Sequence, residues 1–166
     1  MPIEIERKFL VTGNEWRVAA GVKFSQGYLN RDKTRTVRVR IAGNQGFLTI
    51  KGATVGATRA EFEYEIPLVD AENLLAFCEG PIIQKVRHIS EYKGFNWEVD
   101  EFQGENTGLV IAEIELLSEN QPLEKPSWVG EEVTYDTRYF NSNLAQNPYI
   151  TWREKNAPNP HSSVTG

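Results

Sequence analysis

Hydrophobic and polar residues alternate with a period of two along most of the chain, which is typical of strands whose two faces differ. At the start of the chain, Ile3, Ile5 and Phe9 alternate with Glu4, Glu6 and Lys8. The same alternation recurs seven more times, and each run is bounded by turn-forming residues. We therefore predict eight strands, over residues 3–11, 24–30, 36–42, 46–52, 59–68, 82–92, 95–102 and 108–117.

Short glycine-containing links between these runs predict antiparallel neighbours. Links of this kind occur at 42–46, 93–94 and 103–106, and such lengths suit hairpins. Helical patterns are predicted over 14–21, 70–78 and 138–146. The two edge strands of an open eight-stranded sheet would leave backbone N–H and C=O groups unpaired, and closure into a barrel is the common way to avoid this. The predicted fold class is α+β, mainly antiparallel β, as a closed eight-stranded tunnel barrel with a few flanking helices.

Composition and charge set limits on function. The chain has 166 residues, of which 40% are hydrophobic and 25% charged, with a net charge of −5. This length suits one domain, predicted over 1–152, followed by a flexible polar tail over 153–166. The negative charge argues against binding of nucleic acid. The sequence has no apolar run of about 18 residues and no secretory signal at its start, so neither a membrane segment nor export is expected. A single cysteine, Cys78, fits a reducing, cytoplasmic location.

The charged faces of the predicted strands separate by sign. Arg38 and Arg40 share one face of their strand, whereas Glu61, Glu63 and Glu65 share a face of another. Like charges about 7 Å apart repel by about 0.6 kcal/mol in water and by several times more in an enclosed site. A solvated face usually mixes its charges, which is the alternative interpretation. The repeated segregation favours a lumen that holds divalent cations at its carboxylates and a multivalent anion at its bases.

The donor types narrow the chemistry further. Carboxylates without cysteine or clustered histidine ligands suit Mg²⁺ or Mn²⁺ and disfavour zinc. Five or more lysines and arginines in one cavity match the charge of a triphosphate, and arginines can bind its oxygens in pairs. The sequence contains no P-loop pattern. Hydrolysis of a phosphoanhydride bond by positioning and charge neutralisation is therefore a candidate reaction.

Several ordered blocks resemble the CYTH superfamily, also called the triphosphate tunnel metalloenzymes. Glu4-x-Glu6-x-Lys8 is similar to its ExExK signature, and further similarity lies in TVRVR (36–40), TIKG (49–52), RAEFE (59–63), QKVRH (84–88), WEVD (97–100), AEIEL (112–116) and GEEVTYDTRY (130–139). The resemblance spans about residues 2 to 146. It implies an eight-stranded tunnel with charged residues pointing inward.

The resemblance also implies roles for individual residues. The metal ligands are expected to be Glu4, Glu6, Glu113 and Glu115, and the catalytic residues Lys8 and Glu115. The expected phosphate-binding residues are Lys8, Arg38, Arg40, Lys51, Lys85, Arg87 and Arg138. Glu61, Glu63 and Asp100 are expected to face the tunnel, with roles that vary within the family. Many relatives have a lysine beside the position of Arg138, where this chain has Thr137.

By this resemblance the chain is expected to be a triphosphatase that uses Mg²⁺ or Mn²⁺ and acts on a small triphosphate. Inorganic tripolyphosphate is the leading candidate substrate, and its expected products are pyrophosphate and phosphate. A class IV-type adenylate cyclase and a thiamine triphosphatase are the alternative enzymes. A polyphosphate-binding module without catalysis is the alternative from another class. Relatives often pair as homodimers, and the oligomeric state of this chain stays open.

Overall fold

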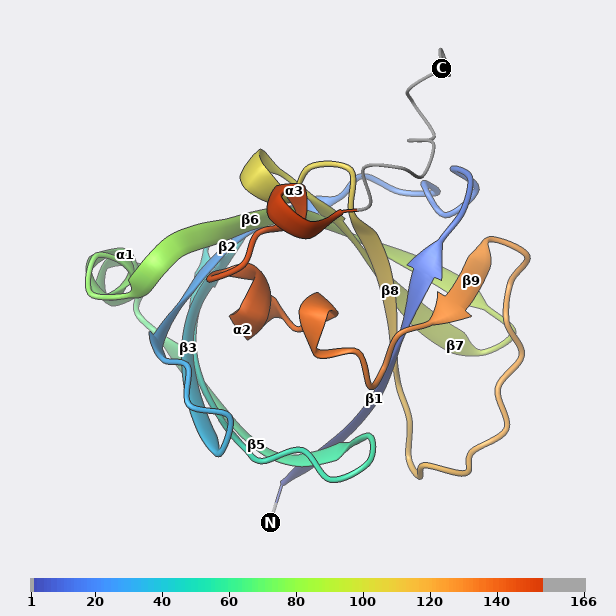
Figure 1. Cartoon of the computed structure of the whole chain (residues 1–166), viewed down its shortest axis with the longest axis horizontal. Helices are drawn as coiled ribbons and strands as arrows, with labels where there is room; N and C mark the ends of the chain where they lie inside the picture. Colours follow the sequence, from blue (N-terminus) through green and yellow to red (C-terminus); the bar gives the residue numbers. More distant parts are fainter. Residues whose placement is uncertain (1, 154–166) are drawn as a thin grey trace.

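The computed structural model describes residues 2–153 and is built on nine antiparallel strands (Figure 1). The strands are β1 (Ile3–Val11), β2 (Val22–Asn30), β3 (Arg35–Ala42), β4 (Gln45–Gly52), β5 (Thr58–Ile66), β6 (Glu79–Tyr92), β7 (Phe95–Phe102), β8 (Val110–Glu115) and β9 (Val129–Glu132). Their order is β5-β4-β3-β2-β6-β7-β8-β1-β9, and β1 also pairs with β5. This last pairing closes eight strands into a barrel, which confirms the predicted fold.

The closing strand, β1, divides its hydrogen bonds among three partners. Its first residues pair with β5, with Glu4 opposite Arg59, and its middle residues pair with β8, with Lys8 opposite Glu113. Its last residues pair with β9. The turn between β6 and β7 favours their antiparallel pairing. Its residues Lys93 and Gly94 have φ angles of 49° and 85°, which is the backbone pattern of a type I′ hairpin.

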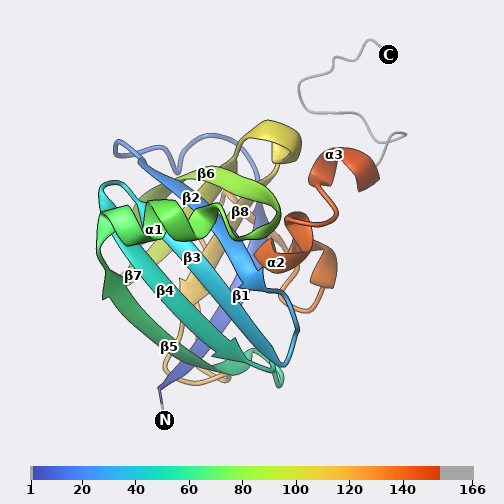
Figure 2. The same ribbon diagram turned by 90° about the vertical axis from the view of Figure 1, so that its left-hand side faces the viewer.

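The shorter elements lie around the barrel and at one of its ends. They are α1 (Leu68–Leu75), α2 (Asn141–Leu144), α3 (Tyr149–Trp152) and the 3₁₀ turns η1 (Gly104–Asn106) and η2 (Thr137–Tyr139). Figure 2 shows α1 lying across the outer side of β3 and β4. Within residues 2–153, no helix is long and apolar enough to cross a membrane.

Three local predictions need correction. The predicted helix over 14–21 is absent, and this segment is an irregular loop. Its Trp16 side chain is buried and donates a hydrogen bond to the carbonyl of Gly13, so tertiary packing overrides the weak helical pattern. The helix predicted over 138–146 is divided into η2 and α2, and β9 was not predicted because four residues carry no readable alternation. The tail predicted over 153–166 lies outside the described residues except for Arg153.

One of two hydrophobic clusters among the described residues lies outside the barrel wall. Residues on the outer faces of β1, β7 and β8 pack against the loops that cover them, in a cluster that includes Phe9, Trp97, Val99, Ile114 and Trp128. Phe9, Trp97 and Val99 are fully buried. Because successive side chains in a strand point to opposite faces, burying these residues outward turns their charged neighbours inward. The charged residues therefore line the bore.

One end of the bore is closed by the chain segment that contains η2 and α2. Figure 1 shows this segment, in orange, across the middle of the ring of strands, and Figure 2 places α2 beside one end of the barrel. Tyr139 and Leu144 from the segment join a second apolar cluster with Tyr28, Ile83 and Phe102. The bore is thus a pocket with an apolar seal at one end.

Candidate functional site

The barrel encloses a cavity of about 240 Å³ whose wall is dominated by charged side chains. Acidic residues on the wall are Glu4, Glu6, Glu61, Glu63, Glu98, Glu113 and Glu115. Basic residues on the wall are Lys8, Arg38, Arg40, Lys51, Arg59, Lys85 and Arg87. Since both signs face the same space, the cavity can bind cations and anions together.

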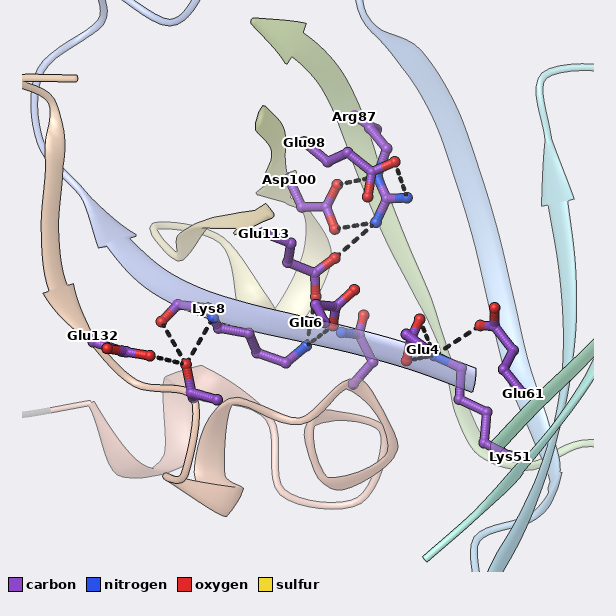
Figure 3. Close-up of polar contacts among 12 residues, drawn as sticks. Glu4, Glu6, Lys8, Lys51, Glu61, Arg87, Glu98, Asp100, Glu113 and Glu132 are labelled. Atoms are coloured by element: carbon purple, nitrogen blue, oxygen red, sulfur yellow. Dashed lines mark hydrogen bonds and ion pairs between the residues drawn. The ribbon is translucent and has the colours of Figure 1, made fainter. Parts of the chain in front are cut away.

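Lys8 lies between carboxylates from two neighbouring strands (Figure 3). Its Nζ is 2.5 Å from Glu113 Oε2 and 3.4 Å from Glu6 Oε1. Burial opposes the charge on Lys8, but Glu113 and Glu6 outweigh burial and raise the pKa of its ammonium. Lys8 therefore carries a fixed positive charge in the bore.

Glu6, Glu98 and Glu113 form a carboxylate cluster in which one oxygen from each residue lies within 4.8 Å of the others. Burial, followed by repulsion from Glu113, raises the pKa of Glu6 to about 7. Burial also raises the pKa of Glu98 to about 7, with Glu113 and Glu6 adding to it. Glu113 itself remains ionised, because the charges of Lys8 and Arg87 outweigh burial and lower its pKa. The cluster holds more negative charge than its neighbours neutralise.

Oxygen donors crowded in this way fit a hard divalent cation such as Mg²⁺ or Mn²⁺. A cation among Glu6, Glu98 and Glu113 would relieve the repulsion that adds to burial in raising the two pKa values. Among the described residues, Glu6, Glu98 and Glu113 are the set of three carboxylates whose oxygens lie close enough together to bind one ion.

A second acidic group lies beside the cluster and is partly neutralised by lysine (Figure 3). Lys51 Nζ donates hydrogen bonds of 2.9 and 3.1 Å to Glu4 and lies 3.3 Å from Glu61. Glu115 is opposite Glu6 in the β1–β8 register. Burial, followed by Glu4 and Glu61, raises the pKa of Glu115.

The bases on β6 are held by one buried carboxylate on β7. Asp100 Oδ2 lies 2.6 Å from Lys85 Nζ, and Arg87 donates hydrogen bonds of 2.7 and 2.9 Å to the two oxygens of Asp100. Both Lys85 and Asp100 have side chains that are 1% exposed. Asp100 therefore lies beneath the bases and fixes their positions.

The bases on β3 have fewer acidic partners. Arg38 donates to Thr49 at 3.2 Å and to Glu63 at 3.5 Å. Burial lowers the pKa of Arg40 to about 9, and repulsion from Arg38 and Arg87 adds to this effect. A polyanion in the bore would relieve this repulsion, as expected for a phosphate-binding surface.

Most of the residues predicted from the sequence thus face one cavity, whereas Asp100 lies behind its wall and Arg138 lies outside it. The Arg138 guanidinium bonds to Asp136 at 2.7 to 3.2 Å and lies over the ring of Trp152. Its side chain is 56% exposed and is not part of the described cavity wall. The phosphate-binding role expected for Arg138 stays a prediction.

Several wall residues were not predicted. Arg59 shares a strand face with Glu61, so the alternation itself could have placed it in the bore, as it does Glu98 beside Asp100. Thr36, Thr134, Asn141 and Ser142 also line the cavity. The last two come from the segment that closes the bore, and its irregular backbone gives no periodic signal.

Comparison with known proteins gives consistent matches over nearly the whole chain. The model of the CYTH domain matches residues 2–149. The chain is 52% identical to an inorganic triphosphatase of Acetivibrio thermocellus over 153 residues, which cover 91% of this chain and 98% of the relative. An inorganic triphosphatase of Nitrosomonas europaea is 38% identical over 146 residues, with coverages of 86% and 96%. A crystal structure of an inorganic triphosphatase superposes with a TM-score of 0.63 at 36% identity, covering 85% of this chain and 96% of the other.

Proposed function

The chain belongs to the CYTH domain family, and on that premise we propose that it is a metal-dependent triphosphatase whose substrate is inorganic tripolyphosphate. The observation that carries this proposal is the single bore in which a carboxylate cluster and a set of lysines and arginines face the same cavity. Both relatives described above are inorganic triphosphatases. The expected products are pyrophosphate and phosphate.

We assign the cation to the cluster of Glu6, Glu98 and Glu113, with Glu4 and Glu115 beside it. A divalent cation held there supplies neutralisation of phosphate oxygens and a bound water of lowered pKa. The all-oxygen donor set supports Mg²⁺ or Mn²⁺ equally.

The chain's own bases bind and orient the phosphate chain. Arg38, Arg40 and Arg87 present N–H groups that can bind phosphate oxygens in pairs, while Lys8 and Lys85 act as point charges. Lys8 lies beside the carboxylate cluster, so it can stabilise negative charge on the part of the phosphate chain that lies next to this cluster. Positioning and charge neutralisation are the main sources of rate in phosphoryl transfer.

Phosphorus NMR with purified protein tests the proposal. Tripolyphosphate, ATP and thiamine triphosphate are each incubated with Mg²⁺, with Mn²⁺ or with chelator. We expect pyrophosphate and phosphate from tripolyphosphate, and only with a divalent cation. Cyclic AMP from ATP, preferred turnover of thiamine triphosphate, or binding without turnover would each overturn the proposal in favour of a cyclase, a thiamine triphosphatase or a binding module.

Two lysine variants link the activity to the bore. Lys8→Met removes the charge between Glu6 and Glu113 and should lower turnover by about 100-fold or more, the size of loss seen when one transition-state contact is removed. Lys93→Met is the matched control, because Lys93 pairs with Glu124 on the exposed surface, and it should keep wild-type turnover. Equal rates in the two variants would remove Lys8 from the mechanism. The homodimer and the cytoplasmic location stay predictions.

A further inference from the structure

Two uncharged amides, Gln26 on β2 and Asn141 at the start of α2, connect two of the bases in the bore. Arg40 Nε donates to Gln26 Oε1 at 2.8 Å, and Gln26 Nε2 donates to Asn141 Oδ1 at 3.1 Å. Lys85 Nζ donates to the same Asn141 oxygen at 3.0 Å. The hydrogen bonds thus run from Arg40 through Gln26 to Asn141, where they meet the one from Lys85.

The orientation of both amides follows from the chemistry of their partners. Arginine and lysine side chains have donors and no acceptor, so each must face an amide oxygen. With Gln26 Oε1 facing Arg40, its nitrogen is left to donate toward Asn141, whose oxygen is already directed at Lys85. Gln26 is completely buried, and so is Lys85. Each amide therefore has one arrangement that satisfies all of its partners.

An amide fixes a base without neutralising it. Within residues 2–153, Arg40 has no carboxylate partner: it bonds to Gln26, and its guanidinium lies 4.7 Å from the centre of the Phe24 ring. By contrast, Arg87 is held by the carboxylate of Asp100. Binding Arg40 through Nε leaves its other N–H groups for an anion, and its full charge is kept for that anion.

Asn141 also belongs to the segment that closes the bore. It follows η2, begins α2, and lines the cavity together with Phe140 and Ser142. Arg138, the residue of this segment that was expected to reach the phosphate, bonds to Asp136. Through Asn141, the segment contacts two residues of the barrel wall, Gln26 and Lys85.

We propose that Gln26 and Asn141 are positioning residues, which orient Arg40 and Lys85 toward the phosphate chain and fasten the η2–α2 segment across the end of the bore. The inference rests on the proposed function for the identity of the anion. It also predicts coupling: an anion that orders Arg40 and Lys85 stabilises the closed segment, and the closed segment tightens binding of the anion by the same factor.

The test compares two leucine variants in the same short helix. Asn141→Leu removes the shared acceptor and keeps the branching and the number of heavy atoms of the side chain. Asn143→Leu makes the same change and is the control, because the Asn143 side chain bonds to Asn147 and not to a residue of the barrel wall. Tripolyphosphate binding is measured by calorimetry with chelator present, and hydrogen–deuterium exchange is followed over residues 137–147. We expect Asn141→Leu to weaken binding by about 10-fold or more and to speed exchange of this segment, and Asn143→Leu to do neither.

Two further variants separate positioning from general damage. Gln26→Met should raise KM by about 10-fold while kcat changes by less than about 3-fold, because it acts on binding of the phosphate chain. Asn141→Asp keeps the acceptor for Lys85 and Gln26, so it should retain wild-type exchange of the segment while weakening binding by adding negative charge.

The inference is overturned if Asn141→Leu matches Asn143→Leu in binding and exchange, or if Asn141→Asp exchanges as fast as Asn141→Leu. Exchange without ligand tests the fastening independently of any activity. A wild-type protein that binds tripolyphosphate without hydrolysing it would refute the proposed function and leave this inference standing.

Discussion

Removal of the charge on Asp100 should destabilise the protein strongly, although Asp100 is not part of the cavity wall. Its carboxylate is 1% exposed and is shared by Lys85 at 2.6 Å and Arg87 at 2.7 Å. Burial opposes ionisation of Asp100, but the charges of Arg87 and Lys85 outweigh burial and lower its pKa. Asp100→Asn keeps the shape of the side chain and removes the carboxylate that pairs with Lys85, whereas Arg87 keeps Glu98 and Glu113 as partners.

The magnitude follows from the cost of breaking a buried ion pair. Removing one partner of such a pair costs about 3–5 kcal/mol, mostly because the other charge stays buried without compensation. For a domain of this size, each kcal/mol corresponds to about 2–4 °C in Tm. Asp100→Asn should therefore lower Tm by about 6–20 °C.

Thermal unfolding followed by circular dichroism measures this shift. Glu101→Gln is the matched control, since Glu101 is the next residue on β7 and pairs with the partly exposed Arg17 on the outer surface. An exposed pair is worth about 0.2–1 kcal/mol, so its Tm should fall by at most about 4 °C. Tripolyphosphate should raise the Tm of Asp100→Asn more than that of wild type, because it supplies anions to Lys85 and Arg87. Equal Tm values for the two variants would refute the role of Asp100 as buried counter-charge.

Two other substitutions test the electrostatics of the surface and the location of the core. Glu132→Gln should cost about 1 kcal/mol at pH 7. Because the hydrogen bond from Arg7 lowers the pKa of Glu132, this stabilisation is fully present above the ordinary glutamate pKa of about 4.3 and is lost as pH falls through the lowered pKa. Urea unfolding should show the difference from wild type shrinking as pH falls below about 4.3, and a constant difference would contradict the reasoning. Ile114→Ala should lower the free energy of unfolding by about 2–5 kcal/mol, because the Ile114 side chain is 1% exposed on the outer side of the wall. Ile50→Ala is the control and should cost clearly less in the same assay, because Ile50 is 37% exposed. Similar losses would mean that the core does not lie where we describe it.

The fold could be predicted from alternation because one observation fixes both faces of a strand. Once Phe9 is buried outward, Lys8 and Glu6 must follow the opposite pattern, and the same holds for Arg38 and Arg40 on β3. The relative heights of side chains along the bore could not be predicted in this way. They depend on the stagger between strands, which is set by long-range register. The family resemblance implied Glu4, Glu6, Glu113 and Glu115 as metal ligands, and the structure brings Glu98 close to Glu6 and Glu113.

Irregular segments account for the other differences. The side chain of Arg138 is captured by Asp136, whose carboxylate also accepts from the Arg138 backbone N–H at 3.1 Å. An aspartate two residues before an arginine is a local signal for such a turn, and it could have indicated that Arg138 lies outside the cavity wall. No comparable signal marks Asn141, because its importance comes from two wall residues distant in sequence.

The segregation of charge by strand has a different meaning in three dimensions. Along β1, Glu4 and Glu6 are like-charged neighbours, but across the bore Glu4 is neutralised by Lys51. Such cross-strand pairing removes much of the repulsion that first suggested bound cations. At Glu6 and Glu98, burial together with repulsion from Glu113 raises the pKa to about 7. Carboxylate oxygens of Glu6, Glu98 and Glu113 lie within 4.8 Å of one another, and this crowding of oxygen donors is the physical reason for proposing a divalent cation there.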